Sequence, residues 1–128
     1  MTALFFILLV GFEFKHFVAD YLLQTVWMIQ GKGDLRSGGG YAHAGIHALG
    51  SLLVLVATGV PILATALLVG AEFVIHYLLD FAKASYGRGV DPNRQVQLFW
   101  AQHGFDQFLH HLTYAAMVYV ALRSLGIA

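Results

Sequence analysis

The stretch HGFDQFLHHLTY, from His103 to Tyr114, has the pattern of a helix with one polar face. Residues three or four apart share a helix face, so His103, Asp106 and His110 form a stripe, with Gln107 and Tyr114 on the same side. The remaining positions are mostly apolar. Imidazole and carboxylate groups at this spacing are typical of a metal site built on a helix.

The composition predicts an integral membrane protein. Of the 128 residues, 59% are hydrophobic and only 11% are charged. An ordinary soluble domain is about 25% charged, and a chain this short cannot bury so much apolar surface in its own core. We therefore expect one all-α transmembrane domain over residues 1–128, with the lipid bilayer as its surroundings.

The composition also limits the metal ligands and the partners that the protein can use. The chain has no cysteine, which excludes disulfides and thiolate metal ligands, and its seven histidines are a clear excess. The formal net charge is zero. Because there is no basic stripe either, we expect no nucleic-acid partner.

Four helices are expected, at about residues 2–29, 41–58, 61–84 and 92–125, in an up-down four-helix bundle. About 20 residues cross the hydrocarbon core, so each segment is long enough or nearly so. The glycine-rich residues 31–40 are expected to be a flexible loop. In the last helix, Asp91 and Pro92 have the pattern of a cap followed by a first-turn proline.

The basic residues predict an orientation. Lys32 and Arg36 lie in the first loop, Arg88 and Arg94 lie in the third, and the second loop is uncharged. The positive-inside rule then places loops one and three in the cytoplasm and both termini outside, in a multi-pass protein of the bacterial cytoplasmic membrane. Arg123, near the C-terminus, runs against this bias.

Every expected helix carries polar residues of metal-ligand type at helical spacing. In an up-down bundle they all lie at similar depth, on the side of loops one and three. Ionisable groups inside a membrane bundle face one another, water or a metal. The predicted metal ligands are His16, Asp20, His43, His47, His76, Asp80, His103, Asp106 and His110. A zinc ion takes four ligands, so two divalent ions are expected, zinc first, with manganese or iron as alternatives.

This arrangement favours a membrane-embedded metal-dependent hydrolase near the cytoplasmic side. Two metal ions can share a bridging water and clamp the oxygens of a phosphoester, and an amide is the other candidate substrate, small or lipidic. Glu72 and Glu13, expected deeper than the ligands, are the catalytic candidates for moving protons. Lys83, Arg88 and Arg94, near the mouth, would hold an anionic substrate.

Other functions stay open. The same cluster could serve transport or permeation of a divalent metal or of protons, which would require a homo-oligomer because four helices make a thin transporter. A di-iron redox protein is a further alternative, since four-helix bundles can hold iron pairs, but glutamate is scarce here. Lys15, near the middle of the first helix, needs a partner on another helix in every case.

Four stretches, in order, resemble a bacterial family of small integral membrane proteins of unknown function: KHFVADYLLQT (15–25), HAGIH (43–47), EFVIHYLLDFAK (72–83) and HGFDQFLHHLTY (103–114). The resemblance covers nearly the whole chain. It implies a membrane protein and supports the choice of residues, but it implies no reaction. A looser similarity, in motif style alone, is to membrane-bound bacterial proteins regarded as metal-dependent hydrolases.

Overall fold

A computed structural model describes residues 1–127, and these residues form helices and no strand. In chain order the elements are α1 (Thr2–Phe17), the π-helical segment η1 (Val18–Leu22), α2 (Val26–Gly31), α3 (Gly38–Ala57), α4 (Ile62–Tyr86) and α5 (Val96–Ser124). The all-α prediction is therefore confirmed.

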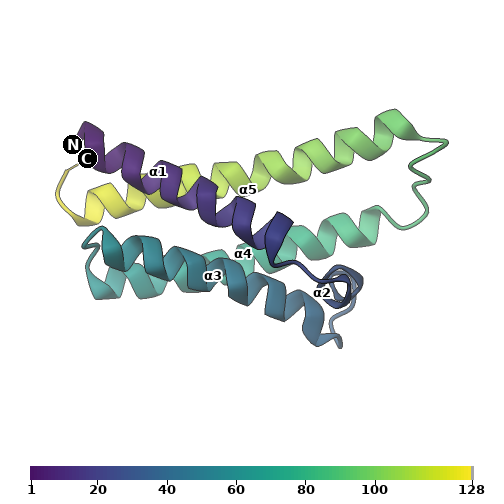
Figure 1. Ribbon diagram of the computed structural model, residues 1–128, viewed down its shortest axis with the longest axis horizontal. Coiled ribbons are helices and arrows are strands. Elements are labelled where there is room, and N and C mark those ends of the chain that lie inside the picture. The colour runs from purple at the N-terminus through teal and green to yellow at the C-terminus, as the bar shows by residue number, and fades with distance from the viewer. Residues whose placement is uncertain (128) are drawn as a thin grey trace.

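The four long helices lie side by side and alternate in direction (Figure 1). Both α1 and α4 pack against α3 and α5. The first turn of α1 and the last turn of α5 lie together at the end of the molecule where α3 turns into α4 (Figure 1). The later parts of α1 and α4 therefore lie level with the earlier parts of α3 and α5.

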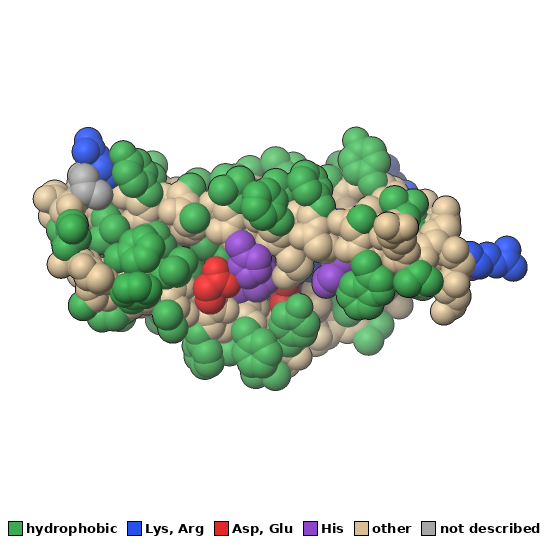
Figure 2. Space-filling view, turned by 90° about the horizontal axis from the view of Figure 1, so that it is seen from above, with side chains coloured by type: hydrophobic (Ala, Val, Ile, Leu, Met, Phe, Trp, Pro, Cys, Tyr) green, Lys and Arg blue, Asp and Glu red, His purple; other side chains and the backbone are tan. Residues whose placement is uncertain are grey.

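Three helical segments are long and apolar enough to cross a membrane, namely Thr2–Leu22, Gly38–Ala57 and Ile62–Tyr86. The helix α5 is not among them, since the polar stretch 103–114 lies across its middle. Hydrophobic side chains cover much of the face seen in Figure 2, whereas the visible Lys and Arg side chains lie towards its two ends. These features indicate a membrane protein in contact with lipid.

The helix predicted over residues 2–29 is divided, so this prediction is wrong in its second half. In η1 the backbone N–H of Leu23 donates to the oxygen of Val18, five residues back, at 3.0 Å. Thr25 then caps α2, its hydroxyl accepting from the N–H of Met28 at 3.4 Å. A π-helical turn is often found at a functional site, and this one carries Asp20.

The glycine-rich segment also differs from the expected loop. The helix α3 begins at Gly38, because Ser37 caps it by accepting from the N–H of Gly39 at 3.3 Å. The short helix α2 packs directly on this first turn: a Cβ at Gly39 would collide with the backbone oxygen of Trp27. Only glycine allows so close an approach of two backbones.

The last helix starts later than predicted. The Asp91 carboxylate accepts from the N–H of Asn93 at 2.8 Å, which closes a turn, and α5 begins only at Val96. An aspartate followed by proline suits a turn as well as a helix start. The pattern alone therefore did not decide between the two.

The apolar core lies at the end of the molecule where α1 begins and α5 ends. Its members come from α1, the end of α3 and the link after it, the first part of α4 and the later part of α5. They are Leu8, Phe12, Leu55, Val60, Leu68, Tyr114, Met117, Val118, Ala121 and Leu122. This core closes one end of the polar centre described next.

Candidate metal centre

Two groups of potential metal ligands meet in the middle of the molecule. Within each group, the ligand atoms all lie within 4.8 Å of one another. The first group is Asp20, His43, His47 and His76, and the second is His76, Asp80 and His110. Five of the six residues are buried, and Asp20 is half-buried.

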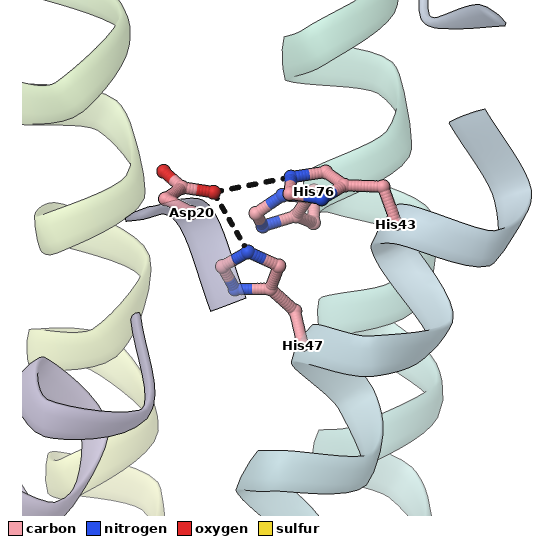
Figure 3. A group of neighbouring side chains, drawn as sticks. All are labelled: Asp20, His43, His47 and His76. Carbon is pink, nitrogen blue, oxygen red and sulfur yellow. Dashed lines mark hydrogen bonds and ion pairs between the residues drawn. The ribbon is translucent and has the colours of Figure 1, made fainter. Parts of the chain in front are cut away.

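In the first group, two imidazoles of α3 face one carboxylate oxygen (Figure 3). The Oδ1 atom of Asp20 lies 3.0 Å from Nε2 of His47 and 3.1 Å from Nε2 of His43. His76 of α4 stacks on His47, with ring centroids 3.8 Å apart. Zinc–ligand bonds of about 2.0–2.1 Å in a tetrahedron put neighbouring ligand atoms about 3.3 Å apart, so the two distances to Asp20 are close to those around one ion.

In the second group, the carboxylate of Asp80 lies close to several histidines. Its Oδ2 atom lies 3.4 Å from Nε2 of His76 and 3.4 Å from Nε2 of His43, and its Oδ1 atom lies 3.5 Å from Nε2 of His110. The ammonium group of Lys32 also pairs with Oδ2, at 2.9 Å. Asp80 therefore links the two groups.

Several nitrogens of the centre have no partner of their own. Both ring nitrogens of His43 and of His76 are buried and make no hydrogen bond to any residue that the structure describes. Although Nε2 of His43 lies near Asp20, the two do not meet in hydrogen-bond geometry. A buried polar group left unpaired costs about 1–3 kcal/mol. Coordination of a cation would satisfy one nitrogen of each ring.

His16 lies beside the first group with both ring nitrogens engaged. The side-chain amide of Gln107 donates to Asp106 at 3.1 Å, which turns its oxygen towards His16. The Nε2 atom of His16 therefore donates to that oxygen, at 2.9 Å, and Nδ1 accepts from the hydroxyl of Tyr114, at 3.0 Å. His16 thus supports the centre from the side.

Tyr114 connects His16 to His47. Its hydroxyl donates to His16, and its oxygen accepts from Nζ of Lys15 at 3.2 Å and lies 3.3 Å from Nδ1 of His47. The Nδ1 atom of His47 also accepts from Nζ of Lys15, at 3.3 Å, and its Nε2 atom donates to Oδ1 of Asp20 at 3.0 Å. A ligating histidine is usually oriented by a contact at its other nitrogen.

A buried ion pair lies between the polar centre and the apolar core. Lys15 pairs with Glu72 of α4, and the two side chains are only 7% and 1% exposed. Lys15 also donates to the hydroxyl of Tyr114 at 3.2 Å and to the backbone oxygen of His47 at 3.4 Å. Lys15 thus has the partner on another helix that its depth requires, and Glu72 is its counter-ion. Gly50 leaves room for its stem, because a Cβ there would lie 3.2 Å from Lys15 Cβ.

Three predicted ligands lie outside both groups: His16, His103 and Asp106. His103 contacts Nζ of Lys83 at 3.0 Å, and Asp106 accepts from the same atom at 2.7 Å. Asp106 is nevertheless 3.4 Å from Nε2 of His110, so it borders the second group.

Glu13 does not lie deeper in the cluster, so that expectation is wrong. It is 39% exposed and pairs with His111 at 2.8 Å, away from both ligand groups. Its spacing from His16 suggests a shared face, but three residues span only about 300° of a helix turn. Glu13 therefore points outwards while His16 points in.

The model of one protein family covers almost the whole chain, including every residue of the centre. A family described as "Protein of unknown function (DUF3307)" has a model that matches residues 4–127. The chain belongs to this family. No curated protein and no solved structure matches it. Membership agrees with the resemblance to a family of unknown function and adds no reaction.

A cavity of about 680 Å³ opens beside the second group, between α2, α4 and α5. Its lining includes Asp80, Lys32, Lys83, Arg88 and His103. Two of the three predicted substrate residues, Lys83 and Arg88, therefore line it. Arg94 does not: it is 88% exposed and pairs with Asp91 at 3.6 Å.

Sequence reasoning missed the role of Lys32. The sequence pattern places it only in the first loop, yet it bonds to Asp80 inside the centre. The short helix α2 brings it there, and no pattern in the glycine-rich segment indicates that placement. Gln107 and Tyr114 could be found from their position on the polar face of residues 103–114.

Proposed function

We propose that this chain is a metal-dependent hydrolase embedded in the bacterial cytoplasmic membrane. Its substrate would be a phosphoester or an amide that reaches the centre from the cytoplasmic side. The observation that carries the proposal is the group His76, Asp80 and His110, whose member Asp80 lines the cavity. Catalytic zinc sites have three protein ligands and keep a further position for water or substrate.

In this proposal α5 crosses the membrane with the other three long helices as one up-down bundle. Its polar residues need not meet lipid, because Asp106, His110 and Tyr114 are buried against the centre. The ends that carry Lys32 and Arg88 would face the cytoplasm, and both termini would lie outside.

The six residues of the two groups suffice for two divalent ions. If His76 binds with the second group, Asp20, His43 and His47 remain for the other ion. Zinc is the first choice, with manganese or iron as alternatives, because the donors are imidazole and carboxylate. Two divalent ions supply Lewis-acid activation and a reactive water.

In the hydrolysis, the water oxygen bonds to phosphorus or to the acyl carbon. The bond to the leaving oxygen or nitrogen breaks, and the leaving group takes up a proton. Glu72 is the candidate that moves protons, since its Oε2 atom is buried without a hydrogen bond to any described residue. Lys83 and Arg88 would hold the anionic part of the substrate.

The apolar core favours hydrolysis over permeation. A path across the membrane needs polar or open space on both sides of the centre. On the side of the chain termini, Leu8, Phe12 and Leu55 are fully buried in that core. Transport of metal or protons through one chain would have to open this packing, and an oligomer would have to supply another route.

The test uses detergent-purified protein loaded with zinc or manganese. We expect hydrolysis of p-nitrophenyl phosphate, or of an anilide as the amide probe. His110→Ala should abolish it, whereas His111→Ala should keep it, because His111 is the adjacent histidine outside both groups. Metal flux into proteoliposomes without hydrolysis would support the transport alternative instead.

A further inference from the structure

The cavity beside Asp80 has a cationic lining. Lys32, Lys83 and Arg88 contribute three positive charges, against one carboxylate from Asp80. Lys32 and Lys83 each hold a carboxylate of the centre, at 2.9 Å and 2.7 Å. Arg88 is exposed, and one arm of its guanidinium donates to the backbone oxygen of Gly33. Such a lining suits a phosphate group, which accepts several charge-assisted hydrogen bonds.

An apolar groove continues from this cavity between α4 and α5. It has a volume of about 200 Å³, and it shares Lys83 and Gln102 with the cavity. The rest of its lining is mostly apolar: Leu79, Ala82, Tyr86, Phe105 and Leu109, with Asp106 at the inner end. Both spaces are lined by residues from the end of α4 and the first half of α5.

The groove opens towards the surface that would face lipid. Tyr86 is 81% exposed and Phe105 is 62% exposed. Both belong to the two helices that flank the groove, α4 and α5. An acyl chain bound in the groove would stay partly in contact with the bilayer. Its apolar surface would not become exposed to water, so its entry would cost little free energy.

We infer that the site takes an anionic lipid, with its phosphate in the cationic cavity and its acyl chain in the groove between α4 and α5. This inference rests on the proposed function and specifies its substrate class as a phosphate-bearing lipid. Lys83 stands at the junction, since it lines both spaces and contacts Asp106 and His103. A free phosphate ion would use the cavity alone and would leave the groove without an occupant.

The test measures lipid binding by native mass spectrometry on metal-free protein in detergent. The probes are 1-oleoyl lysophosphatidic acid, monoolein, which has the same chain but no phosphate, and inorganic phosphate. We expect the lysophosphatidic acid to bind at least about tenfold more tightly than either of the others, because hydrogen bonds to a charged group and burial of several methylenes each contribute that much.

Two variants separate the two parts of the site. Arg88→Gln should weaken binding of both lysophosphatidic acid and phosphate, and its control is the exposed Arg94→Gln. Ala82→Phe should fill the groove and weaken only the lipid. Its control is Ala71→Phe, on the exposed face of the same helix.

The inference is overturned if monoolein binds as tightly as the lysophosphatidic acid, which would remove the headgroup site. It is also overturned if phosphate alone binds as tightly, since the ligand would then be a soluble ion. Metal content and hydrolysis of p-nitrophenyl phosphate are measured on the same preparation. Because lipid binding is measured without metal, a failure of hydrolysis and a failure of lipid recognition remain distinct results.

Discussion

Tyr114 connects two histidines whose roles differ. Its hydroxyl lies 3.0 Å from Nδ1 of His16 and 3.3 Å from Nδ1 of His47, and its ring stacks on Phe12 in the apolar core. Tyr114→Phe would keep the ring packing and remove only the hydroxyl. We expect zinc affinity to fall about 10- to 100-fold, as when other bonds to ligating histidines are removed.

This change in affinity can be measured by competition with a chromophoric chelator. Tyr119→Phe is the control, because Tyr119 lies on the same helix and is 59% exposed. Equal zinc affinity in wild type and Tyr114→Phe would show that the Tyr114 hydroxyl does not support His47 as a ligand.

The buried Lys15–Glu72 ion pair predicts that the effects of substituting the two residues on stability are not additive. Glu72→Met would leave a buried ammonium group without its carboxylate, and we expect a loss of about 3–5 kcal/mol in the free energy of unfolding. The double variant with Lys15→Met should recover most of that loss, since it removes both charges. Denaturant unfolding in detergent measures both. A double variant less stable than Glu72→Met would argue against the pairing.

The residue types of the centre could be predicted from the sequence, but their contacts could not. Histidine and carboxylate at helical spacing indicate a shared face, and six residues chosen in this way do meet. The spacing does not give the rotation of one helix against another, which decides that Glu13 reaches His111 while Lys15 reaches Glu72. It also does not reveal Lys32, which a separate short helix brings in.

The packing of α2 on α3 gives a prediction at the scale of the element. Gly39→Ala would place a methyl group against the backbone oxygen of Trp27, so the two helices must move apart. We expect a loss of about 1–3 kcal/mol in stability, as for other overpacked sites. Zinc binding should weaken as well. Lys32 follows directly on α2 and pairs with Asp80 of the centre, so a shift of α2 would disturb that contact.

Gly45→Ala is the matched control within the same helix. Nothing lies within 4 Å of a Cβ at Gly45, so alanine there meets no obstacle. It should leave stability unchanged or raise it by up to about 1 kcal/mol, because alanine favours the helix more than glycine does. Thermal unfolding in detergent compares the two variants. A Gly39→Ala protein as stable as Gly45→Ala would show that the backbone contact is absent.

The long apolar helices could be predicted from hydrophobicity and length, but the break after η1 could not. The polar spacing of Glu13, His16, Asp20 and Gln24 runs through the break without interruption. Gln24 lies beyond the end of η1, and its side chain donates to the backbone oxygen of Asp20 at 3.0 Å. The periodicity of the polar residues therefore predicts one continuous helix. The local hydrogen bonds instead form a π-helical turn, followed by a new helix cap.

Orientation is a prediction about the whole molecule. With loops one and three in the cytoplasm, Asn93→Cys should react with an impermeant maleimide only when the cytoplasmic side is open. Thr2→Cys should react from outside in intact spheroplasts. The chain has no cysteine of its own, so each label reports one site. The reverse pattern of labelling would invert the orientation that the basic loops predict.

The most direct test of the metal centre is the metal content of the purified protein. Elemental analysis would be made on detergent-purified wild type, on His76→Ala and on His111→Ala, before and after adding zinc, manganese or iron. We expect about two ions per chain in wild type and in His111→Ala, and loss of at least one in His76→Ala, because His76 belongs to both ligand groups. Wild-type protein that retains no metal even after addition would contradict this expectation.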